Sequence, residues 1–260
     1  MEFPQSTVTD IIESEHQMAL KAPERFGDYF LHAMEANELL NNFLISVGIE
    51  GHIFVAFLAQ IRKHALLSIL STARLHQVQA MMDMRQALEA GSCAAFAIAN
   101  PDVDGFADID DSGIIDPTQE LTRKRYKWLE ENFPAGSEAI KNMKKVINSS
   151  TAHSNLVYAM QSFALDPDGD QFVTPFFDTE DDYHLKGNLW MIANVSYGLM
   201  DLFFGINQGK DLLKFHPDFV SRLKALRAKN DELKAVMMSS PRFQAALDKK
   251  PRPMATEPSS

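Results

Sequence analysis

The sequence contains a single cysteine, Cys93, among its 260 residues. One cysteine excludes an intrachain disulfide and fits a protein of a reducing compartment, so we predict a cytoplasmic protein. Basic residues are also scarce, because 25 lysines and arginines stand against 35 aspartates and glutamates, for a formal net charge of -10. Nucleic acids and anionic membranes both attract a positive field. We therefore expect neither nucleic acid nor a membrane as a partner.

Several familiar motifs are absent as well. The N-terminal residues lack a basic region followed by an apolar run, so no secretory signal is expected. The chain has no glycine-rich phosphate loop, no GxSxG, no HExxH and no CxxC. Glu13 and His16 have the spacing of one di-iron ligand pair, but a second such pair is missing. We predict neither a metal nor a cofactor.

One apolar run, Leu189–Ile206, approaches the length of a membrane span. It contains Asn194 and Asp201, and an aspartate near the centre of a span costs roughly 2.5 to 3.5 kcal/mol. We therefore predict a buried helix at the centre of a bundle and not a membrane span.

Helical periodicity dominates the chain and predicts an all-α, single-domain bundle of about seven or eight helices. Thr7 and Asp10 form a capping box, and a break is expected near Ser71–His76 within a long helical stretch. The turn-forming residues Asp166–Asp170 predict a small β-hairpin insertion. We assign residues 1–248 to the bundle and 249–260 to a disordered tail.

The acidic segment Asp108–Gln119 matches part of a calcium-binding loop. Its twelfth position is Gln119 where a bidentate glutamate is needed, and Pro117 lies inside the loop. Asp116 as a helix cap, followed by Pro117 at the first helical position, explains the second half without calcium.

Polar residues occupy unexpected places on the helix that follows the break. On a helical wheel Arg85 and Glu89 fall in the middle of the apolar sector, whereas Gln79, Asp83 and Gln86 cluster on the side expected to face water. A charge that faces a core must be paired, hydrogen-bonded or bound to a ligand.

The apolar helix near the C-terminus shows the same pattern. Trp190, Asn194, Tyr197 and Asp201 share one face of an otherwise apolar helix. We predict one internal polar layer built from Arg85, Glu89, Asn194, Tyr197 and Asp201. It is either a structural network or a pocket for a small polar or anionic ligand that Arg85 grips.

His153 follows Ser149, Ser150 and Thr151, which are poor residues for a helix interior, so a helix break is expected there. His153 is either bonded to nearby backbone or a proton shuttle, since the ordinary pKa of histidine is about 6.5. Asn155 either orients a substrate or caps a helix.

Four segments together resemble a bacterial family of all-helical proteins known as a domain of unknown function. They are MRQALEAGSCAAFAIANP, RYKWLEENF, INSSTAHSN and PFFDTED, within the middle two-thirds of the chain. More remotely, such proteins resemble the HEPN superfamily, some members of which cut RNA without metal by using an arginine shortly before a histidine. Here Val146, Ile147 and Asn148 occupy the three positions that would hold this arginine. The sequence therefore departs from the pattern, unless Arg85 supplies the charge from another helix.

The leading functional hypothesis is a non-catalytic binding or regulatory module. Its ligand-binding residues would be Arg85, Glu89, His153, Asn155, Asn194, Tyr197 and Asp201. The alternative is a HEPN-like, metal-independent enzyme that processes nucleic acid in a defence or toxin system, with His153 as its candidate catalytic residue. Whether the protein is an enzyme, and whether it forms a homodimer, are left open.

Overall fold

A computed structural model describes residues 7–109, 115–116, 118–150, 164–165, 172–173, 176–178 and 181–248. Within these residues the chain forms nine α-helices, which confirms the all-α bundle. They are α1 (Val8–Phe26), α2 (Asp28–Asn42), α3 (His52–Ala73), α4 (Gln77–Ala99), α5 (Gln119–Asn132), α6 (Pro134–Ser150), α8 (Asp182–Ile206), α9 (Phe219–Ser239) and α10 (Pro241–Asp248). The short α10 was not expected from the sequence.

Three small antiparallel ribbons accompany the helices. β1 (Leu44–Val47) pairs with β6 (Leu213–Phe215), β2 (Asp108–Ile109) with β3 (Ile115–Asp116), and β4 (Ala164–Leu165) with β5 (Phe172–Val173). The β4–β5 ladder confirms the predicted hairpin, although its turn, 166–171, lies outside the described residues.

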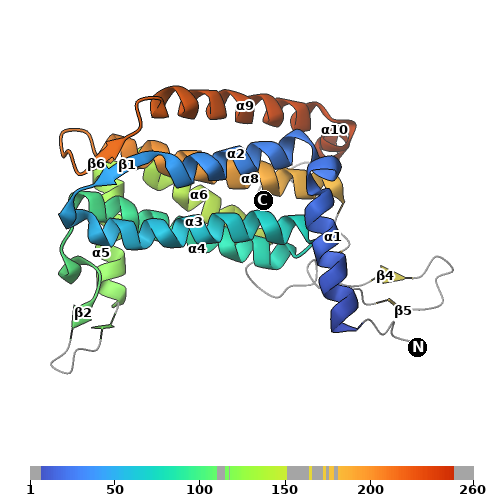
Figure 1. The fold of residues 1–260 in the computed structure, drawn as a ribbon, viewed down its shortest axis with the longest axis horizontal. Coiled ribbons are helices and arrows are strands. Elements are labelled where there is room, and N and C mark those ends of the chain that lie inside the picture. The colour runs from blue at the N-terminus through green and yellow to red at the C-terminus, as the bar shows by residue number, and fades with distance from the viewer. Residues whose placement is uncertain are drawn as a thin grey trace, which may run out of the picture.

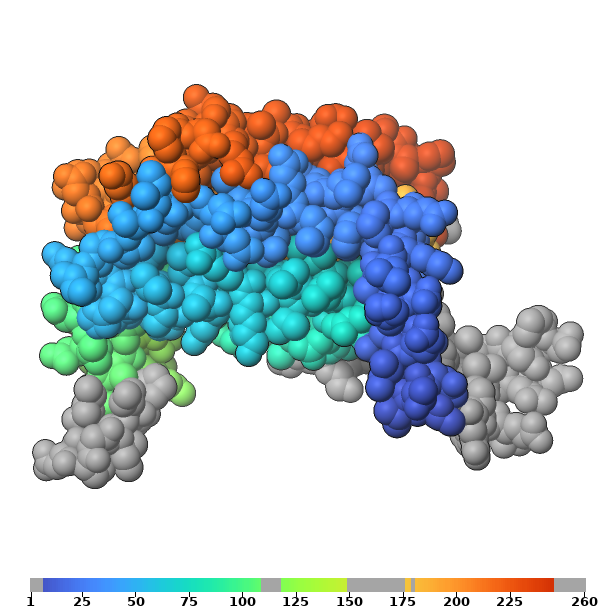
Figure 2. Space-filling model, viewed as in Figure 1, coloured from blue at the N-terminus to red at the C-terminus, as the bar shows by residue number. Residues whose placement is uncertain are grey.

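The long helices are stacked in layers (Figure 1). α9 lies along one side of the bundle, α2 and α8 form the next layer, and α3 and α4 lie beyond them. α8 is the central helix, because it packs against α2, α3, α4 and α9. α5 and α6 pack against each other and against α4, and α1 projects from one end of the bundle as a ridge (Figure 2).

Local sequence explains several helix ends. The predicted capping box is present, since Thr7 Oγ1 accepts from the Asp10 N–H at 3.2 Å and the Asp10 carboxylate accepts from the Thr7 N–H at 3.0 Å. The expected break in the long helical stretch is also confirmed, because α3 ends at Ala73 and α4 begins at Gln77. Leu75 adopts a left-handed conformation in that turn, with φ at 62°.

Two expected helix boundaries are wrong. Thr118, and not Asp116, caps α5, because Thr118 Oγ1 accepts from the Leu121 N–H at 3.3 Å while Asp116 pairs with Asp108 in the β2–β3 ribbon. The apolar residues of Glu24–Val47 recur near helical spacing and predict one helix, but α1 ends at Phe26, α2 ends at Asn42 and Leu44–Val47 forms β1. Pairing with the distant β6 overrides the local helical pattern there.

Two helical stretches are long and apolar enough to cross a membrane by length and composition, namely Ile49–Ala73 and Asp182–Ile206. In the most apolar window of each, 33% and 50% of the residues are buried inside the protein. The core helix of a soluble protein passes the same test, so the two stretches are weak evidence for a span.

Candidate functional site

The polar stripe of α8 faces α9. Trp190 Nε1 donates to the Asn230 carbonyl at 2.8 Å, and Asn230 Nδ2 donates to Asn194 Oδ1 at 3.2 Å. The Tyr197 hydroxyl donates to the same Asn194 oxygen at 2.8 Å. Trp190, Asn194 and Tyr197 therefore share one helix face, as predicted, and their common partner is α9.

The inner end of this network is a buried histidine of α2. His32 is 2% exposed, and its Nε2 lies 3.1 Å from Asn230 Oδ1. Because Asn230 Nδ2 already donates to Asn194, Oδ1 is the acceptor and His32 Nε2 carries the hydrogen. The buried Nδ1 has no hydrogen-bond partner among the described residues. Burial lowers the pKa of His32 below its ordinary value, so the imidazole is neutral near pH 7.

The outer end of the network is charged and open to solvent. Arg227 of α9 donates to the Asp201 carboxylate at 3.1 Å, with side-chain exposures of 58% and 47%. The Arg227 guanidinium also lies 5.8 Å from the centre of the Tyr197 ring. Burial raises the pKa of Tyr197, so its phenol stays protonated and its O–H can donate.

A cavity of about 640 Å³ opens beside this outer end, between α6, α8 and the part of α9 that carries Arg227. Asn194, Tyr197, Asp201 and Arg227 contribute its polar wall. The apolar wall comes from side chains of α4, α6, α8 and the α5–α6 junction: Leu88, Phe133, Ile140, Met143, Val195, Leu199 and Leu202.

Two glycines of α8 form part of the cavity surface. A Cβ atom added at Gly198 or at Gly205 would meet no atom within 4 Å. At Gly136, on the opposite wall, an added Cβ would lie 2.8 Å from Leu202 Cδ1. The α8 side of the cavity is therefore open space that packing leaves unfilled.

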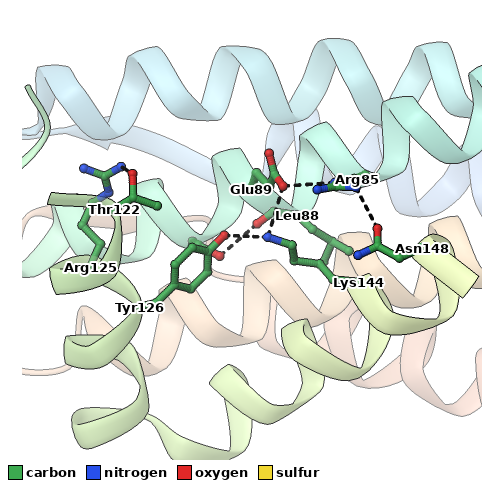
Figure 3. Close-up of polar contacts among 9 residues, drawn as sticks. Arg85, Leu88, Glu89, Thr122, Arg125, Tyr126, Lys144 and Asn148 are labelled. Carbon is green, nitrogen blue, oxygen red and sulfur yellow. Dashed lines mark hydrogen bonds and ion pairs between the residues drawn. The ribbon is translucent and has the colours of Figure 1, made fainter. Parts of the chain in front are cut away.

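Arg85 and Glu89 lie in a second polar group, which α4 shares with α5 and α6 (Figure 3). Arg85 Nε donates to Glu89 Oε1 at 3.2 Å, and Arg85 Nη1 donates to Asn148 Oδ1 at 2.8 Å. Lys144 Nζ lies 3.1 Å from the same Glu89 oxygen and donates to the Tyr126 hydroxyl at 2.9 Å.

The charges of this group support one another. Burial raises the pKa of Glu89, but hydrogen bonds and ion pairs with Lys144 and Arg85 outweigh it and hold the pKa below its ordinary value. Burial lowers the pKa of Lys144, but the contacts with Tyr126 and Glu89 outweigh it and raise the pKa above its ordinary value. Both side chains are therefore charged at neutral pH.

The predicted site residues thus fall into two separate groups. Among the described residues, no hydrogen bond or ion pair joins Arg85 or Glu89 to Asn194, Tyr197 or Asp201. Asp201 does not belong to an internal layer, because its carboxylate is exposed. His153 and Asn155 lie outside the described residues.

One further expectation about α4 is wrong. Gln79 and Gln86 are exposed as predicted, but Asp83 is 3% exposed. Its two carboxylate oxygens contact His64 Nδ1 at 2.8 Å and Gln79 Nε2 at 2.9 Å. The partner on α3 lies 19 residues away, so the wheel of one helix could not reveal it.

Sequence reasoning also missed the partners that complete both groups. Arg227 and Asn230 stand three residues apart on α9, and Lys144 and Asn148 four apart on α6, so each pair lies on one helix face. That spacing was a usable signal. Both pairs, however, lie on amphipathic helices, whose polar side chains are expected to face water. For this reason they were not predicted to contact another helix.

Arg125 of α5 is a further buried cation, 8% exposed. Its guanidinium donates to the Gly105 and Phe106 carbonyls at 3.2 and 3.3 Å and to Thr122 Oγ1 at 3.1 Å, as Figure 3 shows for Thr122. These contacts hold the segment after α4 against α5.

Among the described residues, no group of three or more His, Cys, Asp or Glu side chains could hold a metal ion. Comparison of the chain with models of protein families, with curated proteins and with solved structures gave no match.

Proposed function

We propose that this protein is a binding module whose cavity between α6, α8 and α9 holds a small molecule. The ligand is apolar over most of its length and carries one polar or anionic end. The observation that supports the proposal best is the unfilled cavity of about 640 Å³, bordered by bare backbone at Gly198 and Gly205. Ligand pockets in proteins are typically about 300–1,000 Å³, mostly apolar, with a few convergent polar groups.

The polar wall favours a hydrogen-bond acceptor at one end of the ligand. Asn194 Oδ1 already accepts two hydrogen bonds, and its amide nitrogen has no hydrogen-bond partner among the described residues. This nitrogen and the Arg227 guanidinium are donors beside the cavity. The Arg227–Asp201 pair is exposed, and such pairs contribute little, about 0–1 kcal/mol, so a ligand carboxylate competes for Arg227 at small cost.

Filling the cavity tests the proposal. Gly198→Leu places a side chain in space where a Cβ meets no neighbour, so the fold should be kept while the ligand is excluded. We expect wild-type protein to bind the amphiphilic anion 8-anilinonaphthalene-1-sulfonate and decanoate, measured by fluorescence and by thermal shift. Gly198→Leu should weaken both by about tenfold or more, a change of about 1.4 kcal/mol or more.

Gly198→Ala is the matched control. It gives the same gain in helix propensity over glycine but leaves most of the cavity open. Equal probe binding by wild type and Gly198→Leu would contradict the proposal. Native mass spectrometry of the purified protein, before and after Gly198→Leu, would reveal a natural ligand that copurifies.

The other functional expectations stay predictions. A HEPN-like enzyme would depend on His153, which lies outside the described residues, and would need a free cation nearby. Arg85 is the arginine that could serve, and its guanidinium is bonded to Glu89 and Asn148. We also keep a cytoplasmic location as part of the proposal.

A further inference from the structure

A groove of about 580 Å³ lies between α5 and α6, apart from the polar wall of the cavity. Its lining residues are Tyr126, Ile140, Lys141, Lys144, Lys145 and Asn148. Ile140 also lines the cavity, so α6 separates the two hollows. None of the polar side chains of the groove contributes to the cavity.

The hydrogen-bond directions in the second polar group leave donors facing this groove. The Tyr126 oxygen accepts from Lys144, and its O–H has no acceptor among the described residues. Asn148 Oδ1 accepts from Arg85, and the Asn148 amide nitrogen has no hydrogen-bond partner among the described residues. Lys144 directs two of its three N–H bonds to Tyr126 and Glu89, and the third has no acceptor in the part of the chain that the structure describes.

The charge around the groove differs from that of the whole chain. Residues 119–150, which form α5 and α6, carry seven lysines and arginines against four glutamates, for a net charge of +3. The whole chain carries -10. Glu130 pairs with Lys141 at 2.9 Å, and the Lys145 side chain is exposed on α6. A small anion therefore meets a local positive field together with several N–H and O–H donors.

We infer that this groove binds the phosphate group of a small phosphorylated molecule. A phosphate dianion offers acceptor oxygens in several directions, which matches donors that converge from the two helices. Lys144 and Lys145 supply charge, and Asn148 and Tyr126 supply directed donors. Arg85 and Glu89 are positioning residues, because Arg85 orients the Asn148 amide and Glu89 anchors Lys144.

The surroundings favour a small anion over a nucleic acid. A polynucleotide needs positive charge along an extended track, and its affinity grows with the number of phosphates that are neutralised. Here the basic side chains that line the groove all lie on α6, in a chain with a net charge of -10. The exposed Glu130 and Glu131 of α5 and Glu138 of α6 would also repel a longer polyanion.

Titration of the full chain with inorganic phosphate and with adenosine monophosphate, by calorimetry and by phosphorus NMR, tests the inference. We expect both probes to bind. Tighter binding of the nucleotide would indicate an ester as the source, and equal binding would indicate free phosphate. Lys145→Gln should weaken both by about tenfold, because it removes a charge-assisted hydrogen bond.

Asn148→Asp is the second variant. It keeps the oxygen that Arg85 holds, so the fold should be retained, but it replaces two donors with a negative charge and should abolish binding. Lys127→Gln is the matched control, since Lys127 lies on α5, is 77% exposed and pairs with Glu131 outside the groove. It should change the affinity less than about twofold, in keeping with the small effect of exposed pairs.

Three results would overturn the inference. They are no phosphate binding at millimolar concentration, equal losses in Lys145→Gln and Lys127→Gln, and tighter binding of a short single-stranded oligonucleotide than of either probe. Because Gly198→Leu lies outside the groove, it should leave phosphate binding unchanged. Failure of the cavity proposal is thereby distinguished from failure at the groove.

Discussion

Asn230 of α9 donates through Nδ2 to Oδ1 of Asn194 on α8, at 3.2 Å, and Asn230 is fully buried. The same amide accepts from His32 of α2, so one side chain joins α9 both to α8 and to the distant α2. The oxygen and the nitrogen of the Asn230 side chain are thus both hydrogen-bonded. A buried network of this kind rigidifies the core and favours one arrangement of the three helices.

Asn230→Ala should therefore destabilise the protein by about 2–4 kcal/mol, since it opens a small void and leaves the His32 N–H and one acceptor position of Asn194 without partners. Urea unfolding measures the loss. Asn142→Ala, at an exposed asparagine of α6, is the control and should cost little. A loss below about 1 kcal/mol would mean that the network contributes little to stability.

His32 makes stability depend on pH in a predictable direction. Its folded-state pKa is lowered by burial, so below about pH 6.5, the ordinary value, the unfolded chain binds a proton that the folded protein does not. Stability should thus fall as the pH drops from about 6.5 toward the lower folded-state pKa, by up to about 1.4 kcal/mol per pH unit.

Urea unfolding across this range checks the slope. His32→Gln places an amide N–H where the imidazole N–H was and has no titrating group, so the slope should decrease. Asn142→Ala, at an exposed residue that does not titrate, should leave the slope unchanged. Parallel slopes for wild type and His32→Gln would refute this role for His32.

Arg85→Met should cost only about 1 kcal/mol, because Glu89 keeps its ion pair with Lys144 and both Arg85 and Glu89 are partly exposed, at 29% and 35%. Lys144→Met should cost more, since Lys144 is 21% exposed and contacts both Glu89 and Tyr126. A double-mutant cycle of Arg85 and Glu89 should give a coupling of roughly 0.5–1 kcal/mol. A loss of about 3 kcal/mol or more for Arg85→Met alone would instead show that Arg85 completes a buried pair.

Replacement of glycine by alanine should change the stability in opposite directions at Gly91 of α4 and at Gly205 of α8. At Gly91 of α4 an added Cβ would overlap the Leu199 side chain of α8, so Gly91→Ala should destabilise by about 1–3 kcal/mol. At Gly205 of α8 the added methyl meets nothing, and Gly205→Ala should stabilise by about 0.5–1 kcal/mol through helix propensity. Thermal and urea unfolding measure both, and similar effects at the two positions would contradict the packing described for α4 and α8.

The sequence by itself determined most of the helical segments and several of their ends. Thr7 with Asp10 and the break before Gln77 depend on contacts between residues close in sequence, so the local pattern contains the information. The sequence also identified α8 as the central helix, because a helix that is apolar on almost every face must be covered by other helices.

Only the tertiary structure decided what the polar residues do. The periodicity of one helix shows that Arg85 or Asn194 breaks an apolar face, but it does not show which other helix lies opposite. Asn148 lies 63 residues from Arg85, and Asn230 lies 36 from Asn194. Packing of the helices placed α6 beside Arg85 and α9 beside Asn194, so the single expected layer became two separate polar groups. The cavity beside Gly198 has the same origin, because a volume between helices depends on their relative positions, which no local pattern specifies.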